Sequence, residues 1–220
     1  MPFTPQEITD LPDVISAPRF ATYLQAKQGH VDQALELYAW NMEVSAAFMV
    51  PLPLCEVAIR NAAGDAIEAV HGANWPWVNG FIRSLPVPRR QTDYDPQRNL
   101  RTVAGRQPTV GKVVSELNFA FWEKVFTQGQ DSRIWDAHLR TVLPGIPAGL
   151  TVAQARAQIF LDLERIRKFR NRIAHHEPIF ARNLPNDYAS IRELVEYRRA
   201  EAANWLGKGG RGTGLIAIRP

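Results

Sequence analysis

Residues 151–176 read TVAQARAQIFLDLERIRKFRNRIAHH, a long stretch that favours one uninterrupted helix. Thr151 is a good N-cap, the residues after it are strong helix formers, and no glycine or proline follows until Pro178. We therefore predict a helix from about Thr151 to about His176.

Apolar residues recur along this helix at steps of four, three and seven, at Ile159, Leu163, Ile166 and Ile173. Steps of four and three from Ile166 to Ile173 would put an apolar residue at position 170, where the chain has an arginine. We therefore expect Arg170 on the core-facing stripe. A guanidinium there must be paired or must line a wet cleft. Two interpretations are open: a structural salt bridge, to Glu56 or Glu164, and a functional cation.

His175 and His176 close the same helix shortly before Pro178. Asn171 and His175 lie one turn apart on one face, whereas Arg170 and His175 are separated by about 140° around the axis, a gap that a long arginine side chain can close. Free carbonyls at a helix end favour an imidazolium, and a histidine that titrates near neutrality acts as base and as acid. A capping role is the alternative, and the neighbouring Arg170 and Asn171 favour catalysis.

Three further segments precede the motif Arg170-Asn171-x-x-x-His175: ALELYAWN (34–41), LCEVAIRN (54–61) and SELNFAFW (115–122). Together with RNRIAHHEPI (170–179), they resemble the signatures of the Abi-like branch of HEPN-domain ribonucleases, which is associated with bacterial abortive infection. R-x4-H alone arises by chance in many proteins, but four ordered signatures are specific. One departure is Ala120, where glycine is usual.

The resemblance implies an all-α protein, a HEPN-like helical bundle with additional helices and a loop-rich insertion. It also implies a metal-independent endoribonuclease without cofactors, a toxin or phage-defence effector that cleaves RNA by attack of the ribose 2′-hydroxyl. His175 is then the general acid and base, Arg170 stabilises the phosphate charge, and Asn171 orients either His175 or a phosphate oxygen. The family implies a homodimer with a composite active site, and an antitoxin or other regulator is a possible further partner. Some HEPN toxins carry a modifiable tyrosine two residues after the histidine, where this chain has Glu177.

Four polar residues are expected to support the motif: Glu56, Arg60, Asn61 and His176. Glu56 and Arg60 are four residues apart in the order that favours an intrahelical ion pair. The HEPN layout brings their helix against the motif helix, so Glu56 is equally a candidate to hold Arg170 or His175 in place. Both interpretations are open.

Basic residues are unevenly distributed in a chain whose net charge is +4. Between residues 83 and 112 there are seven basic and two acidic side chains, and a second cluster surrounds the motif. A solvated surface is the alternative, but two clusters beside this motif favour contact with RNA phosphates. The residues that we expect to bind RNA are Arg89, Arg90, Arg98, Arg101, Arg167, Lys168 and Arg172.

We predict one domain over residues 1–206, with a basic insertion at 73–108 and a flexible, glycine-rich tail at 207–220, of which 215–218 could dock on a neighbouring surface. Helices are expected at 16–29, 31–49, 52–70, 109–126, 131–142 and 186–206, with Pro51 and Pro53 breaking the path between the second and the third.

We find no apolar run that would span a membrane and no signal peptide, so we expect a cytoplasmic protein. Cys55 is the single cysteine, and no motif for zinc or nucleotide binding is present. The alternative function is a non-catalytic HEPN module that binds RNA or a protein partner.

Overall fold

The computed structural model describes residues 3–208 and 211–220, and every regular element in them is a helix, which confirms the all-α prediction. The bounds are α1 Pro5–Ile15, α2 Ala17–Ala26, α3 Val31–Phe48, α4 Pro51–His71, α5 Asn79–Ser84, α6 Pro96–Ala104, α7 Val110–Glu116, α8 Phe119–Val125, α9 Asp136–Val142, α10 Val152–Ala174, α11 Leu184–Arg198, α12 Ala200–Lys208 and α13 Arg211–Ala217. Short 3-10 turns occupy Trp75–Trp77 and Gln128–Gln130, and a π-helical turn, Asp131–Trp135, leads into α9.

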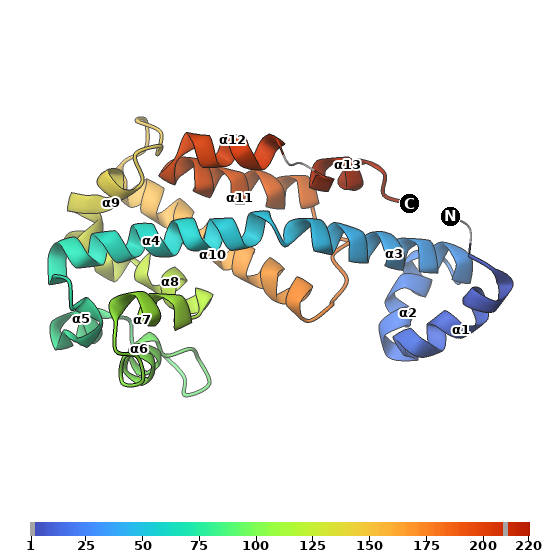
Figure 1. Cartoon of the computed structure of the whole chain (residues 1–220), viewed down its shortest axis with the longest axis horizontal. Coiled ribbons are helices and arrows are strands. Elements are labelled where there is room, and N and C mark those ends of the chain that lie inside the picture. The colour runs from blue at the N-terminus through green and yellow to red at the C-terminus, as the bar shows by residue number, and fades with distance from the viewer. Residues whose placement is uncertain (1–2, 209–210) are drawn as a thin grey trace.

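Helices α3 and α4 follow one another so closely that they form a long rod through the molecule (Figure 1). Pro51 stands in the first turn of α4, where its missing N–H costs no helical hydrogen bond, so the break falls between Phe48 and Pro51, as predicted. By length and composition, the 41-residue stretch Val31–His71 could cross a membrane, a test that core helices of soluble proteins also pass. Many of its apolar side chains are buried against other helices, so the core accounts for much of its apolar character.

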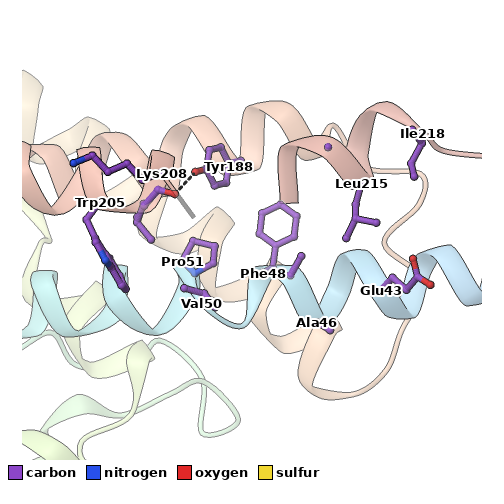
Figure 2. Close-up of a pocket in the computed structure, with 13 residues that line it drawn as sticks. Glu43, Ala46, Phe48, Val50, Pro51, Tyr188, Trp205, Lys208, Leu215 and Ile218 are labelled. Atoms are coloured by element: carbon purple, nitrogen blue, oxygen red, sulfur yellow. Dashed lines mark hydrogen bonds between the residues drawn. The ribbon is translucent and has the colours of Figure 1, made fainter. Parts of the chain in front are cut away.

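The C-terminal helices lie along one side of this rod and leave an apolar groove of about 1090 Å³ against it (Figure 2). Residues 211–220, expected to be flexible, include the helix α13, while residues 209–210 lie outside the described part. The Nε1 of Trp40 donates to the Leu215 carbonyl at 2.7 Å, and Arg219 lies over the rings of Trp40 and Phe180. The segment is therefore docked on α3, because the Leu215 carbonyl accepts a hydrogen bond from the Trp40 indole and the Arg219 guanidinium lies over the same ring.

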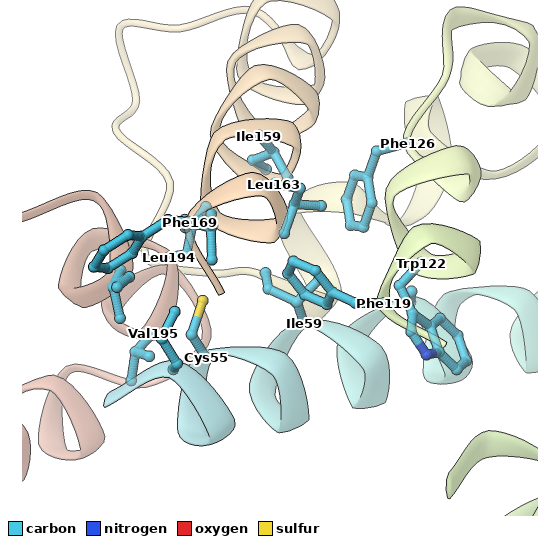
Figure 3. Close-up of a cluster of buried hydrophobic side chains, with 14 of the residues drawn as sticks. Cys55, Ile59, Phe119, Trp122, Phe126, Ile159, Leu163, Phe169, Leu194 and Val195 are labelled. Atoms are coloured by element: carbon cyan, nitrogen blue, oxygen red, sulfur yellow. The ribbon is translucent and has the colours of Figure 1, made fainter. Parts of the chain in front are cut away.

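Helix α10 crosses the rod and packs against it through the core shown in Figure 3. Leu163 and Ile159 of α10 face Cys55 and Ile59 of α4, while Phe119 and Trp122 of α8 and Leu194 and Val195 of α11 close the sides. The N-terminal end of α10 is capped as predicted, since the Thr151 hydroxyl accepts from the Gln154 N–H and the Gln154 side chain accepts from the Thr151 N–H.

Several predicted helix bounds differ from the structure. Helix α1 was not expected, yet Thr4 and Glu7 form a capping box and Pro5 occupies the first turn. The predicted helix 109–126 is two helices, α7 and α8, since Asn118 leaves the helix to cap Phe121 at 3.0 Å. The helix predicted at 186–206 starts earlier, with Asn183 as its cap, and the extended backbone of Arg199 divides it into α11 and α12.

Candidate functional site

Helix α10 ends in a fixed turn that carries both histidines. His175 is the C-cap and His176 follows in the left-handed region, with φ of 54°. The His176 N–H donates to the Ile173 carbonyl at 3.0 Å and the Glu177 N–H donates to the Arg172 carbonyl at 2.8 Å, the pattern that usually has glycine at the left-handed position. A histidine there costs about 1 kcal/mol. The surrounding contacts must therefore hold the turn in this form.

Two side chains fix this turn, that of Arg172 from the last turn of α10 and that of Asn41 from α3. Arg172 donates through Nε and Nη2 to the Pro178 carbonyl, at 3.1 and 2.8 Å, and lies 3.6 Å from the Glu177 carboxylate. The buried Asn41 of α3 accepts from the N–H groups of Ile179 at 2.8 Å and Phe180 at 3.2 Å. The segment after the motif is thereby tied to the rod, which holds His175 and His176 on a rigid corner.

Arg170 does not lie on the buried stripe, contrary to the sequence-based expectation. Its side chain is exposed, and Phe169 is fully buried in its place, with its ring centroid 4.7 Å from that of Phe48. The stripe passes from Ile166 to Phe169 by a step of three and then to Ile173 by a step of four, so helical spacing is satisfied without position 170. The predicted structural salt bridge to Glu56 or Glu164 is also absent among the ion pairs of the described residues.

Arg170, Asn171 and His175 are nevertheless brought together at the end of α10. The Nη1 of Arg170 donates to Oδ1 of Asn171 at 3.4 Å, a long contact that turns the guanidinium towards the Asn171 face. The His175 N–H donates to the Asn171 carbonyl at 2.9 Å, which places these two residues one turn apart on that face. Arg170 and His175, both exposed, and the half-buried Asn171 therefore lie along one edge at the end of α10, although no contact joins the guanidinium to the imidazole among the described residues.

Glu56, Arg60 and Asn61 are not part of this edge. Among the described residues, neither Glu56 nor Arg60 forms an ion pair, and the Nε of Arg60 is buried without a partner, so both predicted roles of Glu56 are missing. Burial raises the pKa of Cys55, and the carboxylates of Glu56 and Asp162 add to that effect. Glu56 follows Cys55 on α4, which faces Leu163 in the middle of α10, several turns before His175 (Figure 3). Asn61 is exposed.

The predicted RNA-binding residues divide into two groups. On α10, Arg167 forms a 2.5 Å ion pair with buried Glu123, Lys168 a 2.9 Å pair with Glu164, and Arg172 holds the turn. In the insertion, Arg89, Arg90, Arg98 and Arg101 are exposed, and no side-chain ion pair is found for them in the described part of the chain. The insertion thus offers more unpaired positive charge than the helix that carries the motif.

Sequence reasoning missed two features next to the motif. Asn41 had no assigned role, although a polar residue on a buried helix face is the signal that could have found it. His176, predicted only as a supporting residue, lines a cavity of about 420 Å³ together with residues of α2. The large groove of Figure 2 is a separate, apolar feature, lined among others by Phe48, Tyr188 and Trp205.

Comparison with known proteins found no matching family model, no similar curated protein and no similar solved structure. Within residues 3–208 and 211–220, no cluster of three or more His, Cys, Asp or Glu side chains is arranged to hold a metal ion.

Proposed function

We propose that this chain is a metal-independent endoribonuclease of the HEPN type that acts in the cytoplasm as a toxin or phage-defence effector. The observation that carries the proposal is the exposed edge formed by Arg170, Asn171 and His175 on a turn held by Asn41 and Arg172. The turn after α10 is held before substrate arrives, so the backbone of His175 needs little ordering at the moment of reaction.

Each side chain has a separate role in the proposed reaction. The imidazole of His175 accepts the proton of a ribose 2′-hydroxyl as its oxygen attacks the adjacent phosphorus, and the bond to the 5′-oxygen of the next nucleotide breaks. The leaving 5′-oxygen takes a proton from a His175 imidazolium, of the same or of a second copy, and the products are a 2′,3′-cyclic phosphate and a 5′-hydroxyl. The Arg170 guanidinium stabilises charge on the phosphoryl oxygens, while Asn171 orients the imidazole or one of these oxygens.

A homodimer would complete this site in our proposal. One edge offers a single exposed guanidinium and a single imidazole, whereas two copies facing one groove would supply separate groups for base and acid. RNA would reach the groove over the unpaired arginines of the insertion.

The second candidate function is a non-catalytic HEPN module that binds a protein partner or RNA. The observation in its favour is the groove of about 1090 Å³ between the rod and the C-terminal helices, where Trp205 and Val50 are exposed. Exposed apolar surface of this kind is typical of binding sites for protein segments.

Incubation of purified protein with total RNA in EDTA tests the proposal. We expect fragments with 2′,3′-cyclic phosphate and 5′-hydroxyl ends from the wild type, and none from Arg170→Ala or His175→Ala. An oligonucleotide with one 2′-deoxyribose at the cleaved position should resist cutting there. Intact RNA with the wild type, or equal cutting by both variants, would favour the binding module.

A further inference from the structure

The cavity beside His176 joins two distant parts of the chain. One wall is the start of α2 and consists of Ser16, Pro18, Arg19 and Thr22. The other wall is the turn after α10 and consists of His176, Glu177 and Pro178. Because His176 follows His175 directly, with Cα atoms about 3.8 Å apart, the backbone of the proposed catalytic residue lies beside the cavity.

Both walls are held by buried contacts. Tyr23 of α2 is fully buried, with ring centroids 5.2 Å from Phe180 and 5.1 Å from Tyr38 of α3. Phe180 is itself fixed through its N–H to Asn41. The separation of the walls therefore follows from packing against α3 and does not depend on a free loop.

The polar groups of the cavity are suited to an anion. No ion pair is found for Arg19 among the described residues, and the first turn of α2 carries no acidic side chain. The Ser16 hydroxyl accepts no capping hydrogen bond from the first amides of α2. The hydroxyl and these amides are therefore not paired with each other. The one acid in the walls, Glu177, lies 3.6 Å from Arg172, which offsets its charge.

A buried donor on α2, close to Arg19, adds a second observation. The Tyr23 hydroxyl has no hydrogen-bond partner among the described residues. Burial raises the pKa of Tyr23 to about 12, whereas the positive charges of Arg19 and Arg172 act to lower it. The hydroxyl therefore lies near Arg19, which lines the cavity, and near Arg172, which holds the adjoining turn, and it is left as an unpaired donor.

We propose that this cavity binds a backbone phosphate of single-stranded RNA, one nucleotide away from the phosphate held at Arg170 and His175. Arg19 provides the charge, and His176, Ser16 and Thr22 provide hydrogen bonds. The choice of RNA as the polymer rests on the proposed function, whereas the anion site rests on the cavity alone. Helix α2 thus sets the register of the strand, so that one ribose is presented to His175.

Binding of a short fluorescent RNA with 2′-O-methyl riboses, followed by anisotropy in EDTA, tests this site without cleavage. Arg19→Gln is compared with Lys27→Gln, which removes the same charge from the end of α2, outside the cavity. We expect Arg19→Gln to weaken binding about tenfold and to reduce the slope of log K against log salt by about 0.7, as loss of one phosphate contact to a single strand does. Lys27→Gln should change affinity less than about twofold.

His176→Asn is a second variant, because asparagine tolerates the left-handed conformation that the turn requires. It should weaken binding in the same direction as Arg19→Gln. Equal effects of Arg19→Gln and Lys27→Gln, or no binding of the probe by the wild type, would overturn the phosphate site. If the probe binds through Arg19 but unmodified RNA is never cut, the proposed nuclease function fails while the phosphate site stands.

Discussion

The amide of Asn41 is buried in α3 and accepts hydrogen bonds from two consecutive backbone N–H groups, those of Ile179 and Phe180. Both N–H groups are buried and need a hydrogen-bond acceptor, which the Asn41 side chain supplies. One side chain, 138 residues away from Ile179, thereby fixes the segment that follows the motif.

Asn41→Ala is expected to destabilise the fold by about 2 kcal/mol or more, because it leaves two buried N–H groups without an acceptor. The free energy of unfolding in urea is the measurement. Asn61→Ala, an exposed site on α4, is the matched control and should stay within about 0.5 kcal/mol of the wild type. A cost no larger than that of the control would show that the turn is not anchored by Asn41.

His176→Gly should stabilise the protein, because glycine takes the left-handed conformation without steric cost. We expect a gain of about 1 kcal/mol and a rise in Tm of about 2–4 °C for a chain of this size. A lower Tm would mean that contacts of the imidazole outweigh the backbone strain.

Arg170 and Phe169 show where single-residue prediction failed. Apolar spacing was read from isoleucine and leucine alone, which left a gap of seven residues before Ile173. Phe169 fills that gap through its contact with Phe48, a residue far away in sequence whose position no local pattern reveals. The spacing of Asn171 and His175 by one turn was predictable, because it depends on helical geometry only. That Arg170 acts together with His175 stays a prediction.

At the scale of helices, ends with a strong local signal were predicted well. Thr151 and Gly72 mark their helix ends through a capping box and a left-handed C-cap, respectively. The ends at Asn118 and Arg199 were missed, because apolar residues continue on both sides of each break. There the packing of two short helices in different directions overrides local helix preference.

The connection between α9 and α10 packs tightly against α11. The Gly145 N–H donates to the Tyr197 carbonyl at 2.9 Å, and a Cβ on Gly145 would lie 2.5 Å from the Glu196 carbonyl oxygen. Gly145→Ala should therefore cost about 1–3 kcal/mol, measured by thermal unfolding. Gly149→Ala, in the same connection but facing open space, should be neutral or slightly stabilising, and equal effects of the two would contradict this packing.

At the scale of the whole molecule, the motif end of α10 lies below the rod, between the insertion around α6 and the pair α1 and α2 (Figure 1). The insertion carries unpaired arginines, and the start of α2 forms one wall of the cavity with Arg19. This placement could not be predicted from sequence, since α1 was not recognised and the direction of α2 depends on Tyr23 packing against Tyr38 and Phe180.

Mixing Arg170→Ala with His175→Ala tests whether two chains share the proposed site. If the edges of both copies face one groove, a mixed dimer still offers one Arg170 and one His175 to the same phosphate, and random exchange makes roughly half of the dimers mixed. Cleavage by the mixture, with none by either variant alone, is the expected result. A mixture that stays inactive although subunit exchange is shown by mass would place the catalytic groups within one chain.

The rate at which His175→Ala cleaves a defined RNA in EDTA is the most direct measurement of the proposed chemistry. His138→Ala, on α9 and outside the motif, is the matched control, and Tm values of both variants show that the fold is kept. We predict that His175→Ala lowers the rate at least about 100-fold while His138→Ala leaves it unchanged. A His175→Ala protein that cuts as fast as the wild type would contradict a catalytic role for the end of α10.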